Sequence, residues 1–266
     1  MTGFSPAWLA LREPADHAAR NIDVATTAAA YVDKRPFAII IDLGSGTGSN
    51  FRALSPRIAT RQAWTFVDND RGLLDAARDL IDAAPQPAAR PPTLSWRVAD
   101  LVRDIDAVLA APAHLVTAAA FFDLVSFAWI EDFCAALARR RLPLYAALTY
   151  DGLEEWRPAH DCDTAVLAAF HAHQHGDKGF GPAAGPAGHL HLCKELTRHG
   201  YQMRVGDSPW VLRAEQRVLM SELAAGIADA AAATGTIEPP ALAAWRQARL
   251  AATSARIGHQ DVFAWL

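Results

Sequence analysis

The stretch that decides the fold is Ile-Ile-Ile-Asp-Leu-Gly-Ser-Gly-Thr-Gly at residues 39–48. An apolar run ends in an acid, and a glycine-rich turn and an Asn-initiated, helix-like segment follow. In α/β proteins such a turn lies where a nucleotide-like ligand meets the carboxyl edge of a parallel sheet. Glycine allows the backbone to approach a ligand closely or to adopt positive φ without Cβ strain. The stretch therefore predicts a ligand-binding turn.

The spacing of the glycines separates two kinds of ligand. In the dinucleotide fingerprint G-x-G-x-x-G, the third glycine packs the helix against the strand. Gly44 and Gly46 fit this pattern, but Ser49 occupies the third position and the last glycine comes one residue early, at Gly48. An NAD(P)-linked oxidoreductase therefore stays an alternative against which the spacing argues. A glycine-rich loop that binds nothing is a second alternative, which the acid and the β-branched run before the turn disfavour.

Strand-like and helix-like segments alternate on both sides of this turn. Continuous apolar runs predict buried strands at 37–43, 63–68, 94–98, 114–119 and 142–149. Apolar residues at helical spacing predict helices at 16–34, 50–54, 70–83 and 121–139. Four prolines predict an exposed loop at 85–92. This alternation is typical of an α/β fold with a doubly wound, mostly parallel sheet and helices on both faces.

The pattern changes after Tyr150, where residues 151–160 have a loop-like composition. We predict a glycine- and proline-rich loop at 176–188, helices at 163–175, 189–199, 214–233 and 239–255, and strands at 201–205, with an extension to 210–212, and at 260–266. The sheet would then have seven strands. We expect one domain over residues 1–266, with a core at 37–150 and helical or loop insertions at 151–200 and 213–257 that form a lid.

The composition bounds the class of protein. With 52% hydrophobic and 20% charged residues, the chain can bury a substantial core. A net charge of -4 gives no argument for a nucleic-acid or membrane partner. Three scattered cysteines do not suit a disulfide framework, and no signal peptide or long apolar span is present, so we expect a cytoplasmic protein. The abundance of alanine, arginine and proline is typical of a bacterial, GC-rich source.

Acids at the ends of three strands extend the glycine turn into a larger pattern. Asp42 precedes the turn, Asp68 ends the second strand, and Asp100 follows the third. The pattern over residues 16–150 resembles the class I S-adenosylmethionine (SAM)-dependent methyltransferases. The resemblance implies a Rossmann-like fold with an antiparallel last strand, SAM as the cofactor, and methyl transfer as the activity.

The residues that the resemblance places around SAM lie in the turn, at strand ends and near the N-terminus: Arg20, Asp42, Gly44, Ser45, Gly46, Gly48, Asp68, Asn69, Asp100, Leu101 and Thr117. The turn would pack against the amino-acid end of SAM, and Asp42 would orient the turn or reach the ligand amine through water. Asp68 would accept hydrogen bonds from the ribose hydroxyls. Asp100 and Leu101 would contact the adenine, and Thr117 would form part of the pocket floor.

Each of these assignments has a structural alternative. Asp68 also fits a cap or turn residue at the end of its strand, and Asp70 would take its place at the ribose if the strand is one turn longer. Asp100 also fits the N-cap of a helix that begins at residue 101. Arg12 and Arg20 fit either the SAM carboxylate or a solvated helix face.

The methyl acceptor is less well defined by the sequence. His171, His173 and His175 stand at alternate positions, but a metal-binding pattern lacks its glutamate and third ligand, so we expect no metal. Among the residues of this segment, His173 and Asp177 are the candidates for substrate binding or proton removal. Five aromatic residues after position 150 either cover an acceptor or pack in the core: Trp156, Phe170, Phe180, Trp210 and Trp245.

The function that we predict is SAM-dependent methyl transfer to a small-molecule acceptor, by in-line displacement. A non-catalytic SAM-binding sensor or partner subunit is the alternative. The alanine-rich C-terminal helices either form a homodimer face or pack on the domain, and the sequence leaves both open.

Overall fold

The computed structural model describes residues 4–83 and 91–266. Its centre is an eight-stranded sheet with the strand order β3-β2-β1-β4-β5-β8-β6, and β7 pairs with β8. The parallel strands are β1 (Phe37–Leu43), β2 (Arg61–Asp68), β3 (Thr93–Val98), β4 (Leu115–Ala119) and β5 (Leu144–Arg157). The antiparallel pairings join β8 (Ser254–Trp265) to β5, β6 (Gln202–Asp207) and β7 (Trp210–Leu212). The predicted α/β sheet with an antiparallel last strand is confirmed, with β7 as an additional strand.

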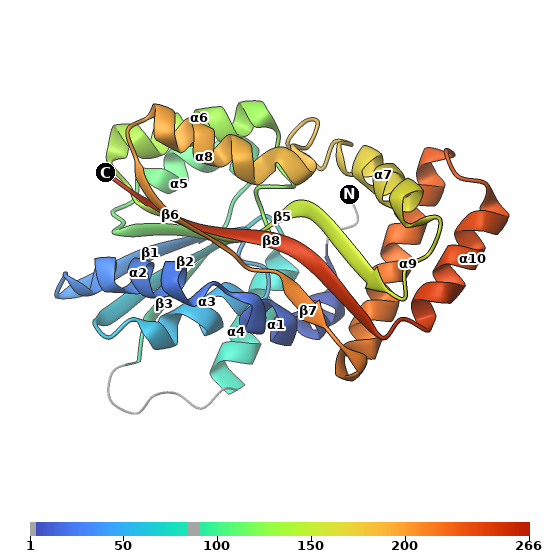
Figure 1. Cartoon of the computed structure of the whole chain (residues 1–266). Coiled ribbons are helices and arrows are strands. Elements are labelled where there is room, and N and C mark those ends of the chain that lie inside the picture. Colours follow the sequence, from blue (N-terminus) through green and yellow to red (C-terminus); the bar gives the residue numbers. More distant parts are fainter. Residues whose placement is uncertain (1–3, 84–90) are drawn as a thin grey trace.

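Helices cover both faces of this sheet (Figure 1). One face carries α5 (Leu101–Leu109), α6 (Phe127–Arg140) and α8 (Gly188–Arg198), and the other carries α2 (Ile22–Asp33), α3 (Ser49–Leu54) and α4 (Arg71–Ala83). Successive residues of a strand point to opposite faces. Ile41 accordingly packs in the core under α5 and α6, whereas Ile40 packs in the core with α2 and α3. The apolar run of β1 is continuous because both of its faces are buried.

The C-terminal half of β5 and the N-terminal half of β8 stay paired, extend beyond the other parallel strands and pack with three more helices (Figure 1). These are α7 (Asp163–Gln174), α9 (Arg217–Thr234) and α10 (Pro239–Leu250). The loop predicted at 151–160 is wrong up to Arg157, because β5 continues through it. A register shift between Tyr150 and Glu154, with Gly152 at φ +92°, interrupts the alternation without ending the strand.

The helices predicted from residues 16 and 121 differ most from the structure at their starts. The helix predicted at 16–34 is divided into α1 (Pro6–Ala19) and α2, and the side chain of Asn21 caps the second helix by accepting the Val24 N–H at 3.1 Å. Pro14 lies inside α1, where a proline predicts a break. The helix predicted from residue 121 begins at Phe127, after the cap Ser126. Pro85 and Pro87 of the predicted loop lie outside the described residues.

Candidate functional site

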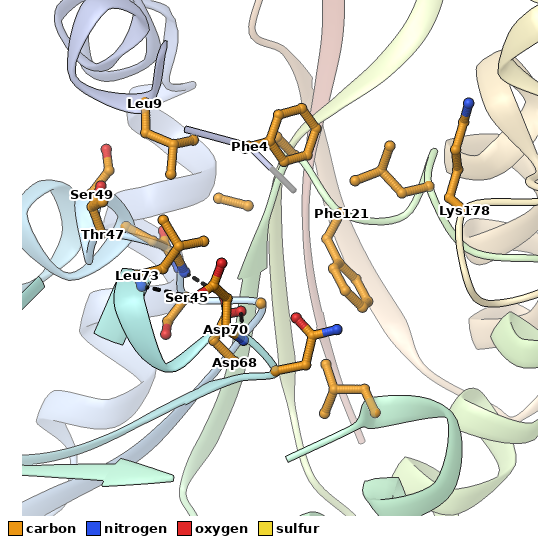
Figure 2. A pocket seen from close by; sticks show the side chains of 18 of the residues that line it. Phe4, Leu9, Ser45, Thr47, Ser49, Asp68, Asp70, Leu73, Phe121 and Lys178 are labelled. Carbon is orange, nitrogen blue, oxygen red and sulfur yellow. Dashed lines mark hydrogen bonds between the residues drawn. The ribbon is translucent and has the colours of Figure 1, made fainter. Parts of the chain in front are cut away.

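A cavity of about 770 Å³ opens at the carboxyl ends of β1, β2, β3 and β4 (Figure 2). Such an edge is where ligands bind in open α/β sheets. The glycine turn, the ends of β2 and β4, the start of α5, the helix α1 and a loop at 178–180 all contribute to its lining. Eight of the predicted SAM-site residues line it: Arg20, Gly44, Ser45, Gly46, Asp68, Asn69, Asp100 and Leu101.

The glycine turn needs its glycines for backbone conformation and for space. Gly44, Gly46 and Gly48 have φ of +57°, +52° and +79°. These are left-handed values that residues with a Cβ adopt at a cost. A Cβ on Gly44 would also lie 2.9 Å from the ring of Phe121. Gly48 is the N-cap residue of α3 rather than a residue of the cavity wall that the structure describes.

Asp68 joins the end of β2 to the glycine turn. Its Oδ2 accepts the backbone N–H of Gly46 at 2.8 Å, and its Oδ1 accepts the N–H of Asp70 at 3.0 Å. Burial raises the pKa of Asp68, and these backbone hydrogen bonds oppose the rise. Asp70 caps the next helix, since its Oδ1 accepts the N–H of Gly72 at 2.7 Å. Both acids line the cavity. Asp68 therefore has the predicted ligand-facing position and also acts as the turn residue at the end of its strand, which was the structural alternative.

A buried polar network lies behind the turn. Asn50, at the start of α3, donates to Asp42 Oδ1 at 2.7 Å and to Thr117 Oγ1 at 2.8 Å. The Arg20 guanidinium donates to Asn50 Oδ1 at 2.6 Å. Burial raises the pKa of Asp42 to about 7, against the lowering effect of the Asn50 hydrogen bond and the nearby Arg20. By accepting the hydrogen bond from Asn50, Asp42 holds the start of α3, the helix that follows the turn.

Asp42 and Thr117 do not belong to the cavity wall among the described residues. Both are fully buried. The floor predicted at Thr117 lies further along the chain, at Ala119 and Ala120, because the Thr117 hydroxyl turns inward to Asn50.

Asp100 and Leu101 lie at the N-terminus of α5. Asp100 is the N-cap residue, accepting the Val102 N–H at 3.0 Å and pairing with the guanidinium of Arg103 at 2.9 Å. Leu101 is buried, and its carbonyl accepts the indole N–H of Trp129 at 3.0 Å. The structural alternative for Asp100 is present, and both residues also face the cavity.

The helix α1 covers one side of the cavity, which the sequence did not predict. Arg12 pairs with Asp16 through two hydrogen bonds of 2.9 and 3.0 Å. The guanidinium of Arg12 also lies 4.9 Å from the ring centre of Trp210, whose indole N–H donates to Asp16. This pairing fixes α1 against β7, and it places Leu9 in the cavity wall.

The loop after α7 reaches the cavity, but the two predicted catalytic residues lie elsewhere. Asp177 is exposed, and its Oδ1 accepts the N–H groups of Gly179 at 2.6 Å and Gly181 at 3.0 Å. That turn presents Lys178 and Phe180 to the cavity. His173 and Asp177 are not among the described lining residues.

The neighbours of His173 have other partners. The Nε2 of His171 lies 2.9 Å from the hydroxyl of Tyr150, and the Nδ1 of His175 lies 3.0 Å from the carbonyl of Ala183. The side chains of His171 and His175 therefore contact different partners.

The aromatic residues after position 150 were expected either to pack in the core or to cover an acceptor, and both occur. Trp156, Trp210 and Trp245 are buried in the core with α9 and α10. Phe180 lines the cavity and makes an edge contact with Phe121 at 5.7 Å between ring centres. The described residues of 213–257 contribute nothing to the cavity wall. Phe121 was missed because the sequence predicted a helix there.

Comparisons with known proteins give the fold. No protein-family model matches the chain, and no curated protein matches its sequence. The cyclopropane synthase MmaA2 from Mycobacterium tuberculosis is similar in structure with a TM-score of 0.53 and 11% identity, over 98% of this chain and 94% of that protein. A cyclopropane-fatty-acyl-phospholipid synthase-like protein from Lactobacillus casei has a TM-score of 0.50 and 12% identity, over 99% and 94% of the two chains.

The chain has the Rossmann-like methyltransferase fold. The fold predicted from the glycine turn and the strand-end acids is thereby confirmed. None of the described helices is long and apolar enough to cross a bilayer.

Proposed function

We propose that this protein is a SAM-dependent methyltransferase that acts on a small-molecule acceptor. The observation that carries the proposal is the convergence of motif residues distant in sequence on one cavity. Gly44 and Gly46 follow β1, Asp68 ends β2, and Asp100 with Leu101 follows β3, and all five line it. A resemblance seen only in sequence would not require them to face the same space.

The polar groups of the cavity fit the parts of SAM. The hydroxyl of Ser45 and the Nε of Arg20 are buried and have no hydrogen-bond partner among the described residues, although both residues line the cavity. Buried polar groups without a partner cost free energy, so these two atoms suit the carboxylate and amine of an amino-acid moiety. Asp68 would hold the ribose hydroxyls, and Leu101 would pack on the adenine.

Bound SAM supplies a methyl group on a positively charged sulfur. When bound, it would deliver this methyl group to an acceptor atom by in-line displacement, with the sulfur as the leaving group. Alignment of the reacting atoms supplies much of the acceleration of such a displacement. The chain's contribution is therefore to orient the acceptor and exclude water, which the apolar wall of Phe121, Leu124 and Phe180 supports.

The size and composition of the cavity support a small acceptor. A volume of about 770 Å³ falls within the usual range for small-molecule sites, roughly 300–1,000 Å³. Phe4 and Leu9 add apolar surface to the lining, and Lys178 adds an amine. The name of the similar structure from Lactobacillus casei makes fatty-acyl phospholipids a class to include among the acceptors tested.

His173 and Asp177 stay predicted contributors to substrate binding or proton removal. A movement of the glycine-containing loop after α7 would bring them to the cavity. Residues 151–200 would then act as the lid. The free cysteines support a cytoplasmic location.

Binding and turnover test this function separately. Isothermal titration calorimetry should show binding of SAM and of its demethylated product, and no binding of NADH at the same concentration. Incubation with methyl-labelled SAM and a panel of small acceptors, lipids included, should then give a labelled product. Absence of SAM binding at high micromolar concentration contradicts the proposal. Binding without turnover of any acceptor in a cell extract favours a sensor or partner subunit.

A further inference from the structure

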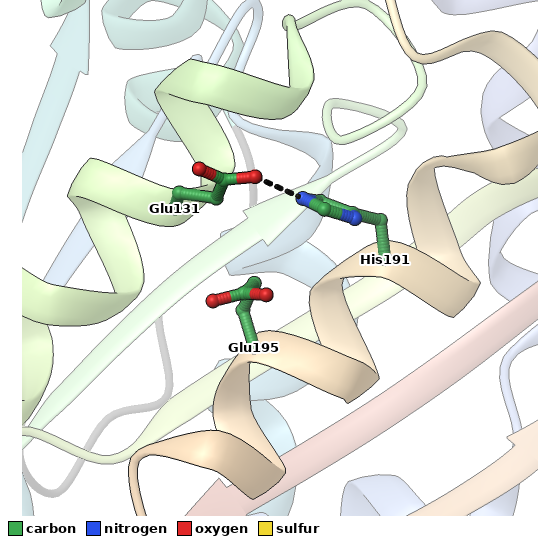
Figure 3. A group of neighbouring side chains, drawn as sticks. All are labelled: Glu131, His191 and Glu195. Carbon is green, nitrogen blue, oxygen red and sulfur yellow. Dashed lines mark ion pairs between the residues drawn. The ribbon is translucent and has the colours of Figure 1, made fainter.

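Three metal-ligating side chains meet between α6 and α8, outside the described wall of the cavity. They are Glu131 on α6 and His191 and Glu195 on α8 (Figure 3). One nitrogen or oxygen atom from each lies within 4.8 Å of the others. No step of the proposed methyl transfer uses them.

The helices bring these side chains together by regular geometry. Residues four apart on a helix share one face, so His191 and Glu195 stand one turn apart on the side of α8 that faces α6. Glu131 approaches from the facing helix, and its Oε1 lies 3.2 Å from His191 Nε2. Sites built from side chains of facing helices are a recurring way to hold a metal.

The charges and hydrogen bonds at this point are incompletely balanced. The side chain of Glu195 is 4% exposed, and its ion-pair partner is Arg198, which is 71% exposed and lies 3.3 Å from Oε2. An ion pair with an exposed partner compensates little for a buried carboxylate. The Nε2 of His191 is buried, and apart from its ion pair with Glu131 it makes no hydrogen bond to any described residue. A cation at this point would be coordinated by the buried nitrogen of His191, and its charge would balance that of the buried Glu195 carboxylate.

We propose that Glu131, His191 and Glu195 bind one Zn²⁺ ion, which links α6 to α8. Imidazole nitrogen and carboxylate oxygen are ligands of zinc, at about 2.0–2.2 Å, and water would complete a four-coordinate site. Two carboxylates and a neutral imidazole match the charge of a divalent cation. Magnesium and calcium prefer more oxygen ligands than the three side chains offer. The proposal departs from the absence of a metal that the sequence led us to expect.

The test uses the untagged, full-length protein after treatment with a chelator and dialysis. Equilibrium dialysis against Zn²⁺ with elemental analysis should give about one ion per chain, and Co²⁺ in place of zinc should give visible absorption bands typical of a protein-bound ion. The variants Glu131→Gln and His191→Asn should each weaken Zn²⁺ binding by about tenfold or more. Neither measurement depends on SAM or on methyl transfer, so its outcome is independent of the proposed function.

Matched variants separate this site from general metal adsorption. Glu222→Gln, at an exposed position of α9, and His199→Asn, at the end of α8, should leave Zn²⁺ affinity unchanged. At the same Zn²⁺ concentration, the melting temperature of the wild-type protein should rise more than that of Glu131→Gln. Because the Glu131 side chain is 50% exposed, this variant should fold even if His191→Asn does not. Zn²⁺ affinity in Glu131→Gln equal to that of the wild-type protein, or no stoichiometric binding to the wild-type protein, would overturn the proposal.

Discussion

The Oδ2 atom of Asp68 accepts the backbone N–H of Gly46 at 2.8 Å, so the end of β2 holds the turn that follows β1. The two residues are 22 positions apart in the sequence and adjacent at the sheet edge. Their hydrogen bond sets the position of a glycine that lines the cavity. The ligand site and the local fold therefore depend on one carboxylate.

Replacement of that carboxylate by an amide should affect stability and ligand binding together. In Asp68→Asn one acceptor oxygen remains for two backbone N–H groups, so one of them loses its partner. We expect a loss of about 1–3 kcal/mol in the free energy of unfolding and SAM binding weakened about tenfold or more. Urea denaturation and calorimetry measure the two effects.

Asp70→Asn is the matched comparison for Asp68→Asn. Asn caps helices about as well as Asp, so the hydrogen bond to Gly72 should persist and the stability should change little. SAM binding should also stay close to the wild-type value. A larger loss of SAM affinity in Asp70→Asn than in Asp68→Asn would identify Asp70 as the acid that holds the ribose.

The glycine turn should not tolerate a methyl group at its first glycine. Gly44→Ala places a Cβ at φ +57° and 2.9 Å from Phe121, so the turn or the ring must move. The left-handed conformation alone costs about 1–2 kcal/mol. We expect that loss in the free energy of unfolding, together with loss of SAM binding by calorimetry.

Gly226→Ala supplies the control for that substitution. Gly226 lies inside α9, and a Cβ there would meet nothing within 4 Å. Alanine in a helix interior is favoured over glycine by about 1 kcal/mol. Thermal denaturation should therefore show a more stable protein with unchanged SAM binding. Equal tolerance at positions 44 and 226 would contradict the role assigned to the turn.

Local pattern was sufficient to predict the site-forming part of the fold. The bounds of β1 agree with the prediction at both ends, because a strand buried on both faces is apolar throughout. The positive φ of Gly44 follows from its residue type and position. The continuation of β5 beyond Tyr150 was missed because its bulges depend on pairing with β8, about 110 residues away. Leu148 has φ +55° there, which its side chain gives no reason to expect.

The residues that line the cavity were only partly predictable for a similar reason. Asp68 ends β2 and Leu101 comes shortly after β3, so their common edge could be inferred from the alternation of elements. Leu9 and Phe180 reach the cavity from α1 and from a loop, and their positions depend on tertiary contacts such as the pairing of Arg12 with Asp16. No spacing in the sequence specifies those contacts.

The buried carboxyl of Asp42 should make the stability of the protein depend on pH. Its folded pKa of about 7 lies above the ordinary value of 3.8, with burial as the main cause. The unfolded carboxyl ionises first as pH rises, so this group's contribution to stability falls between about pH 4 and pH 7. Asp42→Asn removes the titration and retains an oxygen for the Asn50 hydrogen bond.

Urea denaturation of the wild-type protein and of Asp42→Asn between pH 5 and pH 8 measures this effect. Relative to the wild-type protein, the variant should gain on the order of 2 kcal/mol as pH rises from 5 to 8. Asp229→Asn, at a position whose side chain is 75% exposed, should track the wild-type protein. A constant difference between Asp42→Asn and wild type across this range would show that Asp42 stays ionised throughout it.

Asp261 should be the most sensitive residue of the last strand. Its carboxylate is fully buried and accepts the N–H of Leu148 at 2.8 Å and that of Asn21 at 3.0 Å. Asp261→Ala leaves both N–H groups without this acceptor, and a buried donor without a partner costs about 1–3 kcal/mol. We therefore expect a loss of at least about 2 kcal/mol in urea denaturation. Asp207→Ala, which removes an exposed contact with Gln260 at 2.9 Å, should cost much less. Similar losses in the two variants would mean that the bulge at Leu148 does not depend on Asp261.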